Sequence, residues 1–140
     1  MEKLITQNNI LYAKVIRNID DLNSDVVFSE ENDSIQLSLK TYSQNEKTGA
    51  HFHNSYNEKT TRTDEIMLVQ KGKIRVDFYN EIGAYIKSIY AQKGDVIIAY
   101  KGGHNVVIVE EAKILSFNTK QTDNTRIIGA NNFELIIDED

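Results

Sequence analysis

Apolar and polar residues alternate in short stretches along most of the chain. The pattern is clearest from Ile35 to Lys40, where Ile35, Leu37 and Leu39 alternate with polar side chains. A period of two is typical of a β-strand with one buried face. Alternation, β-branched residues and bounding turns predict strands over 10–17, 26–28, 34–43, 65–70, 74–79, 84–90, 96–100, 104–109 and 113–119, and 133–137 is either a last strand or a tail.

Turn segments divide these strands. Lys71–Lys73 is predicted to be a hairpin turn, and Glu110-Glu111 a second turn between two strands. Residues 96–100 are apolar at successive positions, as in a central strand covered on both faces. The chain shows no convincing amphipathic helix. Short strands that recur every 8–12 residues predict an all-β sandwich or barrel.

Length and composition exclude several classes of protein. A chain of 140 residues fits one domain with a hydrophobic core of its own. It has no cysteine, so a disulfide framework and a thiolate metal site are both excluded. The formal net charge is −5 without a basic cluster, which argues against nucleic acid as a partner. We find no signal peptide and no apolar run of about 20 residues, so we expect a cytoplasmic protein without a membrane span.

The three histidines are the main candidates for chemistry. His51 and His53 are two positions apart, so on a strand both rings would leave the same face about 6–7 Å apart. His104 follows Gly102-Gly103, and Glu65 begins the strand after the histidine pair. Three imidazoles and one carboxylate are a ligand set for divalent transition metals. We therefore predict that His51, His53, Glu65 and His104 form a metal site.

The spacing of these residues resembles two motifs of the cupin superfamily. His51-Phe52-His53, and Glu65 followed by six residues and Gly72, match the first motif; Gly94 with the apolar residues after it, and then His104, match the second. The sequence departs from the family pattern at three places: eleven residues separate His53 from Glu65, Asn45 replaces the first glycine, and Tyr100 replaces a proline with His104 one residue early.

The resemblance implies a single all-β cupin domain over residues 1–140, a jelly-roll barrel also called a double-stranded β-helix. Its barrel core would cover about 34–118, with 10–30 and 121–140 packed on it. The chain is similar to small bacterial cupins with a Gly-Gly-His turn and a late Lys120-Gln121, which are common near surface-polysaccharide genes. Cupins often dimerise through sheet edges, so the resemblance also implies a homodimer, with strand 10–17 as the candidate edge.

Each candidate residue has a plainer interpretation. The histidines could be ordinary strand or turn residues, and Glu65 could pair with Arg62 or Arg75. Burying Glu65 unpaired would cost several kcal/mol, a cost that metal coordination would relieve. Residues 54–64 are either a lid, in which Arg62 binds a carboxylate or phosphate, or a solvated loop. The substrate-binding candidates are Arg62, Met67 and Tyr100.

The predicted function is a metal-dependent enzyme acting on a small polar molecule, either a sugar derivative or a hydroxy or keto acid. The reaction types that fit are isomerisation or epimerisation and oxygenation, and no residue has an assigned catalytic role. The metal could be Fe, Mn, Ni, Co, Cu or Zn. The alternatives are a non-catalytic binding or sensor module for a small-molecule ligand and a barrel with a purely structural metal.

Overall fold

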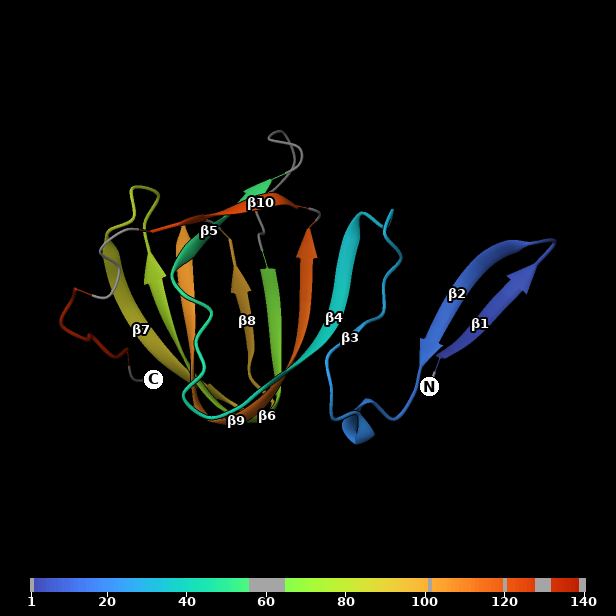
Figure 1. The fold of residues 1–140 in the computed structure, drawn as a ribbon, viewed down its shortest axis with the longest axis horizontal. Coiled ribbons are helices and arrows are strands. Elements are labelled where there is room, and N and C mark those ends of the chain that lie inside the picture. Colours follow the sequence, from blue (N-terminus) through green and yellow to red (C-terminus); the bar gives the residue numbers. More distant parts are fainter. Residues whose placement is uncertain (1, 56–64, 101, 120, 128–131, 139–140) are drawn as a thin grey trace.

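The computed structural model describes residues 2–55, 65–100, 102–119, 121–127 and 132–138, and the structure is all-β as predicted (Figure 1). Its strands are β1 (Glu2–Gln7), β2 (Ile10–Ile16), β3 (Val26–Val27), β4 (Ile35–Tyr42), β5 (His51–Ser55), β6 (Glu65–Tyr79), β7 (Tyr85–Gln92), β8 (Val96–Ala99), β9 (Gly103–Thr119) and β10 (Gln121–Arg126). One 3₁₀ turn, η1 (Ile19–Asp21), is the helical element of the described chain.

Two long antiparallel strands, β6 and β9, organise the barrel into two layers. The first half of β6 pairs with β8 and with the second half of β9, which also pairs with β4. The second half of β6 pairs with β7 and with the first half of β9, which also pairs with β5. We call β3-β4-β9-β6-β8 layer A and β10-β5-β9-β6-β7 layer B; β6 and β9 belong to both.

The predicted turns at 71–73 and 110–111 are wrong, because β6 and β9 continue through these positions. Their register shifts between Val69 and Ile74, so the ladder bends through β-bulges without ending. Gly72 has φ +83°, and the ideal position of a Cβ there would overlap the carbonyl oxygen of Glu111. Gly72 and the charged residues around it lie where β6 and β9 bend together. The local sequence pattern does not reveal that the two strands stay paired through the bend.

The hydrophobic core fills the space between the two layers. Its buried residues come from both layers and from the bend that joins them. On the layer A side they are Met67, Val69, Ala112 and Ile114, and on the layer B side they are Ile74, Val76, Ala91, Val106 and Ile108. Burying each large apolar side chain contributes about 1.5–3 kcal/mol. This contact between layers makes the structure the predicted jelly-roll barrel.

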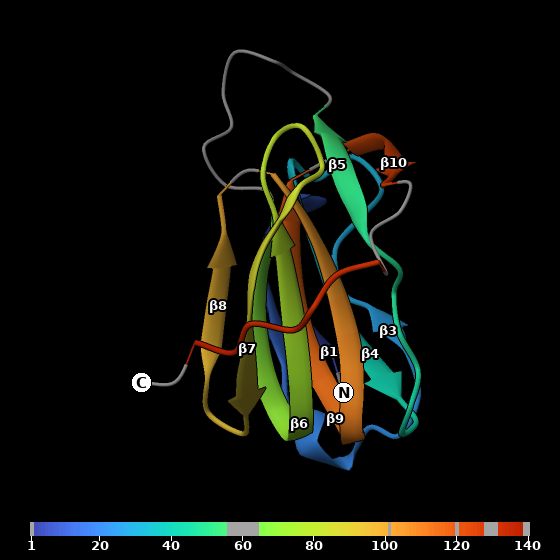
Figure 2. The same ribbon diagram turned by 90° about the vertical axis from the view of Figure 1, so that its left-hand side faces the viewer.

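The C-terminal residues cover the outer face of layer B. Figure 2 shows residues 132–138 running across β9, β6 and β7. The ring of Phe133 stacks on Tyr85 at a centroid distance of 3.8 Å, and the Ser88 N–H donates to the carbonyl oxygen of Ile136 at 2.7 Å. Beneath the tail, the fully buried carboxylate of Asp77 accepts hydrogen bonds from Ser88, Asn105 and Arg75, which offset the cost of burying it.

Four strands differ from the sequence predictions. The structure adds β1 and β10, which the sequence analysis did not predict because both are largely polar. Strand β8 was expected to be central, but among the described strands it pairs with β6 alone and is an edge. Strand β2 was expected to pack on the barrel with the rest of 10–30; β3 does join β4, whereas β2 pairs with β1 in a separate two-stranded sheet.

Within the described residues, no helix is both long enough and apolar enough to cross a membrane.

Candidate functional site

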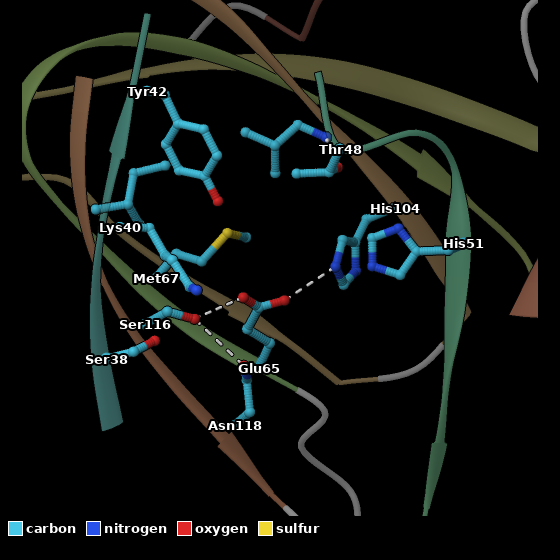
Figure 3. A pocket seen from close by; sticks show the side chains of 12 residues that line it. Ser38, Lys40, Tyr42, Thr48, His51, Glu65, Met67, His104, Ser116 and Asn118 are labelled. Atoms are coloured by element: carbon cyan, nitrogen blue, oxygen red, sulfur yellow. Dashed lines mark hydrogen bonds and ion pairs between the residues drawn. The ribbon is translucent and has the colours of Figure 1, made fainter. Parts of the chain in front are cut away.

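A pocket of about 150 Å³ lies between the two layers at one end of the barrel. Its lining residues come from β4, β6 and β9 and from β5 with the segment before it: Ser38, Lys40, Tyr42, Thr48, His51, Glu65, Met67, His104, Val106, Ile114, Ser116 and Asn118 (Figure 3). Residues far apart in the sequence meet here because antiparallel pairing brings β5, β6 and β9 together.

Glu65, the first residue of β6, points into this pocket (Figure 3). Its Oε2 is 3.0 Å from His104 Nε2, and its Oε1 accepts a hydrogen bond from Ser116 Oγ at 2.7 Å. The single hydroxyl proton of Ser116 goes to Glu65, so in the favourable amide orientation Asn118 donates to Ser116 Oγ at 3.3 Å. These contacts satisfy a carboxylate whose side chain is only 13% exposed.

The two described histidine rings lie side by side on paired strands. His51 of β5 is directly opposite His104 of β9, and their ring centroids are 4.8 Å apart in an edge-to-face arrangement. His51 Nδ1 is 2.6 Å from the carbonyl oxygen of Gly49. A carbonyl accepts only, so Nδ1 carries the proton and Nε2 is the basic nitrogen.

Burial lowers the pKa of His51, an effect that the hydrogen bond to Gly49 partly opposes and the neighbouring His104 reinforces. A lowered histidine pKa means that the neutral ring persists to lower pH. His51 is therefore neutral at pH 7, the form that a metal ligand requires.

The donor set of the pocket fits a divalent transition metal in its chemistry. Two imidazoles and one carboxylate line the same space, and such ligands suit several first-row metals. As the described side chains stand, no group of three His, Cys, Asp or Glu residues is arranged to hold an ion. Glu65 and His104 instead contact each other, so binding a cation would require their direct contact to be replaced by shared coordination.

The remaining predicted site residues differ in where they lie relative to the pocket. His53 lies on β5 opposite Asn124, but its side chain is outside the described set, and Arg62 with residues 56–64 is outside the described residues altogether. Met67 is 2% exposed and lines the pocket. Tyr100 does not line it: the side chain is 57% exposed and borders a separate surface cavity beside Ile86 and Ile98.

Sequence analysis missed the contribution of β4, which supplies Ser38, Lys40 and Tyr42 to the pocket. The alternation on β4 was read correctly, but it suggested a strand with its polar face in solvent. The structure has the reverse arrangement, in which the polar face lines the pocket and Leu37 and Leu39 lie on the outer face of layer A. Hydrophobic periodicity identifies two faces without saying which one faces a polar cavity.

Two of these β4 side chains set the polarity of the pocket. Burial raises the pKa of Tyr42 to about 12, with the negative charge of Glu65 as the next cause, so the phenol stays protonated at neutral pH. Tyr42 can therefore donate a hydrogen bond but is not a general base at pH 7. Lys40 is the one lysine or arginine among the described lining residues, and its Nζ is 3.8 Å from Asp25 Oδ2.

Solved structures with a similar fold belong to cupin proteins. A cupin-2 domain protein from Shewanella frigidimarina is 23% identical over 69% of this chain and 80% of its own, with a TM-score of 0.50. The cupin domain of Schizosaccharomyces pombe Cnp3 is 11% identical over 86% of this chain and 87% of its own, with a TM-score of 0.60. A mutant of Bacillus subtilis oxalate decarboxylase is 15% identical over 69% of this chain, with a TM-score of 0.54, and only 24% of that enzyme is covered.

No protein-family model and no curated protein sequence matches the chain. The two-layered barrel and its fold neighbours nevertheless confirm the predicted class, and the protein has the cupin fold.

Proposed function

We propose that the protein is a metal-binding cupin and a metal-dependent enzyme that acts on a small hydroxy or keto acid. His51, Glu65 and His104 would hold the ion, and His53 would be the fourth ligand. The observation that carries this proposal is the convergence of two imidazoles and a carboxylate, from three strands, on one pocket.

The size and charge of the pocket favour an acid over a sugar derivative. A volume of about 150 Å³ is below the roughly 300–1,000 Å³ typical of sites for drug-sized ligands. Lys40 offers a positive charge, and Tyr42 offers a protonated hydroxyl, which together suit a carboxylate group. The name of one fold neighbour, oxalate decarboxylase, refers to a small acid, and this gives support by analogy alone.

A bound divalent ion would supply Lewis-acid polarisation of a carbonyl or enolate oxygen. The chain's own groups would do the rest. Lys40 would bind the carboxylate, Tyr42 would donate a hydrogen bond to an oxygen of the substrate, and Met67 would exclude water from one wall. Ser116 holds Glu65 by its hydrogen bond to Oε1, which orients the other carboxylate oxygen toward His104.

The first experiment measures metal in the purified protein by elemental analysis and titrates the metal-free protein with Mn, Fe, Co, Ni, Cu and Zn. We expect about one ion per chain in the wild type, because two or three imidazoles and a carboxylate make one site. His51→Ala and Glu65→Gln should each lower metal affinity by about 10-fold or more while the far-ultraviolet circular dichroism stays unchanged. Glu111→Gln is the matched control for Glu65, since this carboxylate is exposed and away from the pocket. Wild-type metal binding in Glu65→Gln would remove Glu65 from the ligand set.

The second experiment tests turnover with a panel of small hydroxy, keto and dicarboxylic acids. Metal-dependent turnover that is lost in His51→Ala would support the enzyme. Binding of an acid without turnover would instead identify a non-catalytic ligand-binding cupin. Lys40→Met should raise the apparent Kd or KM for an acid at least several-fold and leave metal occupancy unchanged, because it removes charge without touching the ligands. An unchanged affinity for every acid would contradict the assigned ligand class.

A further inference from the structure

A second cavity, of about 330 Å³, opens on the surface beside strands β7 and β8. Among the described strands each of these two pairs with β6 alone, so each is the edge of its layer, and we call this space the edge cavity. Its walls include Phe78, Ile86, Ile98, Ala99 and Tyr100. His104 is the one described residue that lines both this cavity and the pocket at Glu65. The edge cavity is therefore a separate space that meets the candidate metal site at a single side chain.

The described walls of the edge cavity are mostly apolar. Ile86, Ile98 and Tyr100 border it and are 47%, 44% and 57% exposed. Large apolar side chains that are exposed singly are common, but three of them around one concavity are typical of a binding surface. The volume of about 330 Å³ is within the range of roughly 300–1,000 Å³ for small-molecule sites, whereas the pocket at Glu65 holds about 150 Å³. The size and the walls therefore suit the apolar part of a small ligand.

The charge of the edge cavity comes from Lys87. It is the one lysine or arginine among the described residues that line the cavity, and none of those residues is acidic. Its Nζ is 3.1 Å from Asp138 Oδ2, a carboxylate oxygen of the C-terminal tail. The Asp138 N–H donates to the carbonyl oxygen of Ser88 on β7 at 2.9 Å, which holds the backbone of the tail beside Lys87. Lys87 thus already binds one carboxylate at the cavity, and the chain itself supplies it.

We propose that the edge cavity binds a small apolar carboxylic acid, with its aromatic ring or branched alkyl chain in the cavity and its carboxylate on Lys87 in place of Asp138. The side chains of Lys87 and Asp138 are 45% and 54% exposed, and an exposed ion pair contributes little to stability, so a ligand can replace this pair readily. The tail stays docked during the exchange, because the ring of Phe133 stacks on Tyr85 independently of the ion pair. Asp138 and the ligand therefore compete for Lys87, and the site does not depend on a bound metal or on turnover.

An NMR titration of the full-length protein with three probes tests the ligand class. Phenylacetate carries a ring and a charge, phenylacetamide keeps the ring without the charge, and acetate keeps the charge without the ring. Phenylacetate should bind at least 10-fold more tightly than either of the others and shift the amide signals of Ile86, Ile98 and Tyr100. Equal affinity for phenylacetamide or acetate, or shifts confined to Lys40 and Ser116 of the other pocket, would overturn the proposal.

The same titration in Glu65→Gln separates this site from the candidate metal site. Glu65 does not line the edge cavity, so phenylacetate should bind this variant as tightly as the wild type, whether or not the metal site exists. Loss of phenylacetate binding in Glu65→Gln would place the acid at the metal site and overturn a separate cavity site.

A substitution in the apolar wall tests where the ring binds. Ile98→Asp places a negative charge at the cavity and should weaken phenylacetate binding by at least 10-fold. Ile82→Asp is the matched control: this isoleucine is 88% exposed in the turn before β7 and does not line the cavity, so its variant should bind as the wild type does. Equal affinities in the two variants would contradict the assigned cavity.

Substitutions of the ion pair test the competition for Lys87. Lys87→Met should weaken phenylacetate binding by at least 10-fold and leave phenylacetamide binding unchanged, whereas Lys93→Met, at an exposed lysine that does not line the cavity, should change neither. Asp138→Asn should tighten phenylacetate binding several-fold, because the ligand no longer displaces a carboxylate, and this gain should disappear when Lys87→Met is also present. An Asp138→Asn variant with wild-type or weaker affinity, or wild-type affinity in Lys87→Met, would overturn the proposal.

Discussion

At the scale of single residues, neighbours decide what an ionisable group can do. Glu65 is a strand carboxylate by sequence, but Ser116 and His104 give it two hydrogen-bond partners inside a pocket. Tyr42 is an ordinary strand tyrosine by sequence, but burial near Glu65 keeps its phenol protonated. Neither property depends on residues close in the sequence, so both required the structure.

The carboxylate of Asp25 provides a prediction of how the free energy of unfolding depends on pH. Its Oδ1 accepts hydrogen bonds from the backbone N–H and the hydroxyl of Thr41, at 2.8 and 3.0 Å, and the backbone bond is the main cause that lowers its pKa. A lowered carboxyl pKa stabilises the folded state above the unfolded value of about 3.9, and this stabilisation is lost as the pH falls through the folded pKa. Asp25→Asn should therefore lower the free energy of unfolding by at most about 1 kcal/mol at pH 7, since the group is largely exposed.

Urea unfolding at pH 7 and near pH 3 measures this effect. The difference between wild type and Asp25→Asn should shrink at the lower pH, because only the wild type has a carboxylate at position 25 that is protonated there. Glu31→Gln, at an exposed acidic position, is the control and should change little at either pH. A difference that is the same at both pH values would contradict the assigned role of the Asp25 carboxylate.

At the scale of elements, the bend in β6 and β9 and the docking of the tail shape the barrel. The bend carries both strands from one layer to the other, so one pair of strands contributes to both walls of the pocket. The tail covers Tyr79 and Asp77 on the outer face of layer B. Each feature depends on a close contact that a single substitution can remove.

Two glycines with similar backbone angles test the bend. Gly72 has φ +83° and Gly94 has φ +93°, so alanine is strained at both, at a cost of about 1–2 kcal/mol. At Gly94 an added Cβ meets nothing within 4 Å, whereas at Gly72 it would overlap the backbone of Glu111. Gly72→Ala should therefore lower the free energy of unfolding by at least about 1–3 kcal/mol more than Gly94→Ala. Equal losses in denaturant unfolding would show that the two strands can move apart at the bend.

The hydroxyl of Tyr85, which lies under the C-terminal tail, provides a second prediction at the scale of elements. Tyr85 Oη is 2.6 Å from Ser88 Oγ, and it accepts a hydrogen bond from the Ile136 N–H at 3.1 Å. Tyr85→Phe should lower the free energy of unfolding by about 1 kcal/mol and increase hydrogen exchange at Ile136. Tyr90→Phe, on the same strand and 45% exposed, is the control and should change neither quantity. Unchanged exchange at Ile136 in Tyr85→Phe would mean that the hydroxyl does not hold the tail.

At the scale of the whole molecule, the hydrophobic core extends well beyond the pocket. Met67, Val106 and Ile114 belong to both, but Val69, Ile74, Val76 and Ile108 are fully or almost fully buried away from it. A core of this kind does not require an ion to form. The fold should therefore be stable with or without a bound metal.

Chelation tests this expectation. An ion that binds only the folded state at 100 times its Kd adds about 2.7 kcal/mol of stability, so chelation should lower the melting temperature by several degrees. The far-ultraviolet circular dichroism at 25 °C should not change. Loss of the β signal on chelation would instead identify a structural metal, and an unchanged melting temperature after chelation of metal-loaded protein would contradict specific binding.

The sequence by itself determined the all-β class, most strand positions and the residues His51, His104 and Glu65, which give the pocket its two described imidazoles and its carboxylate. It could do so because alternation, turn glycines and motif spacing are local properties of the chain. Only the tertiary structure decided that 71–73 and 110–111 are bends within strands, that the polar face of β4 lines the pocket and that β8 is an edge. These features depend on which strands pair across the barrel, and the pairing is set by packing between segments that are distant in the sequence.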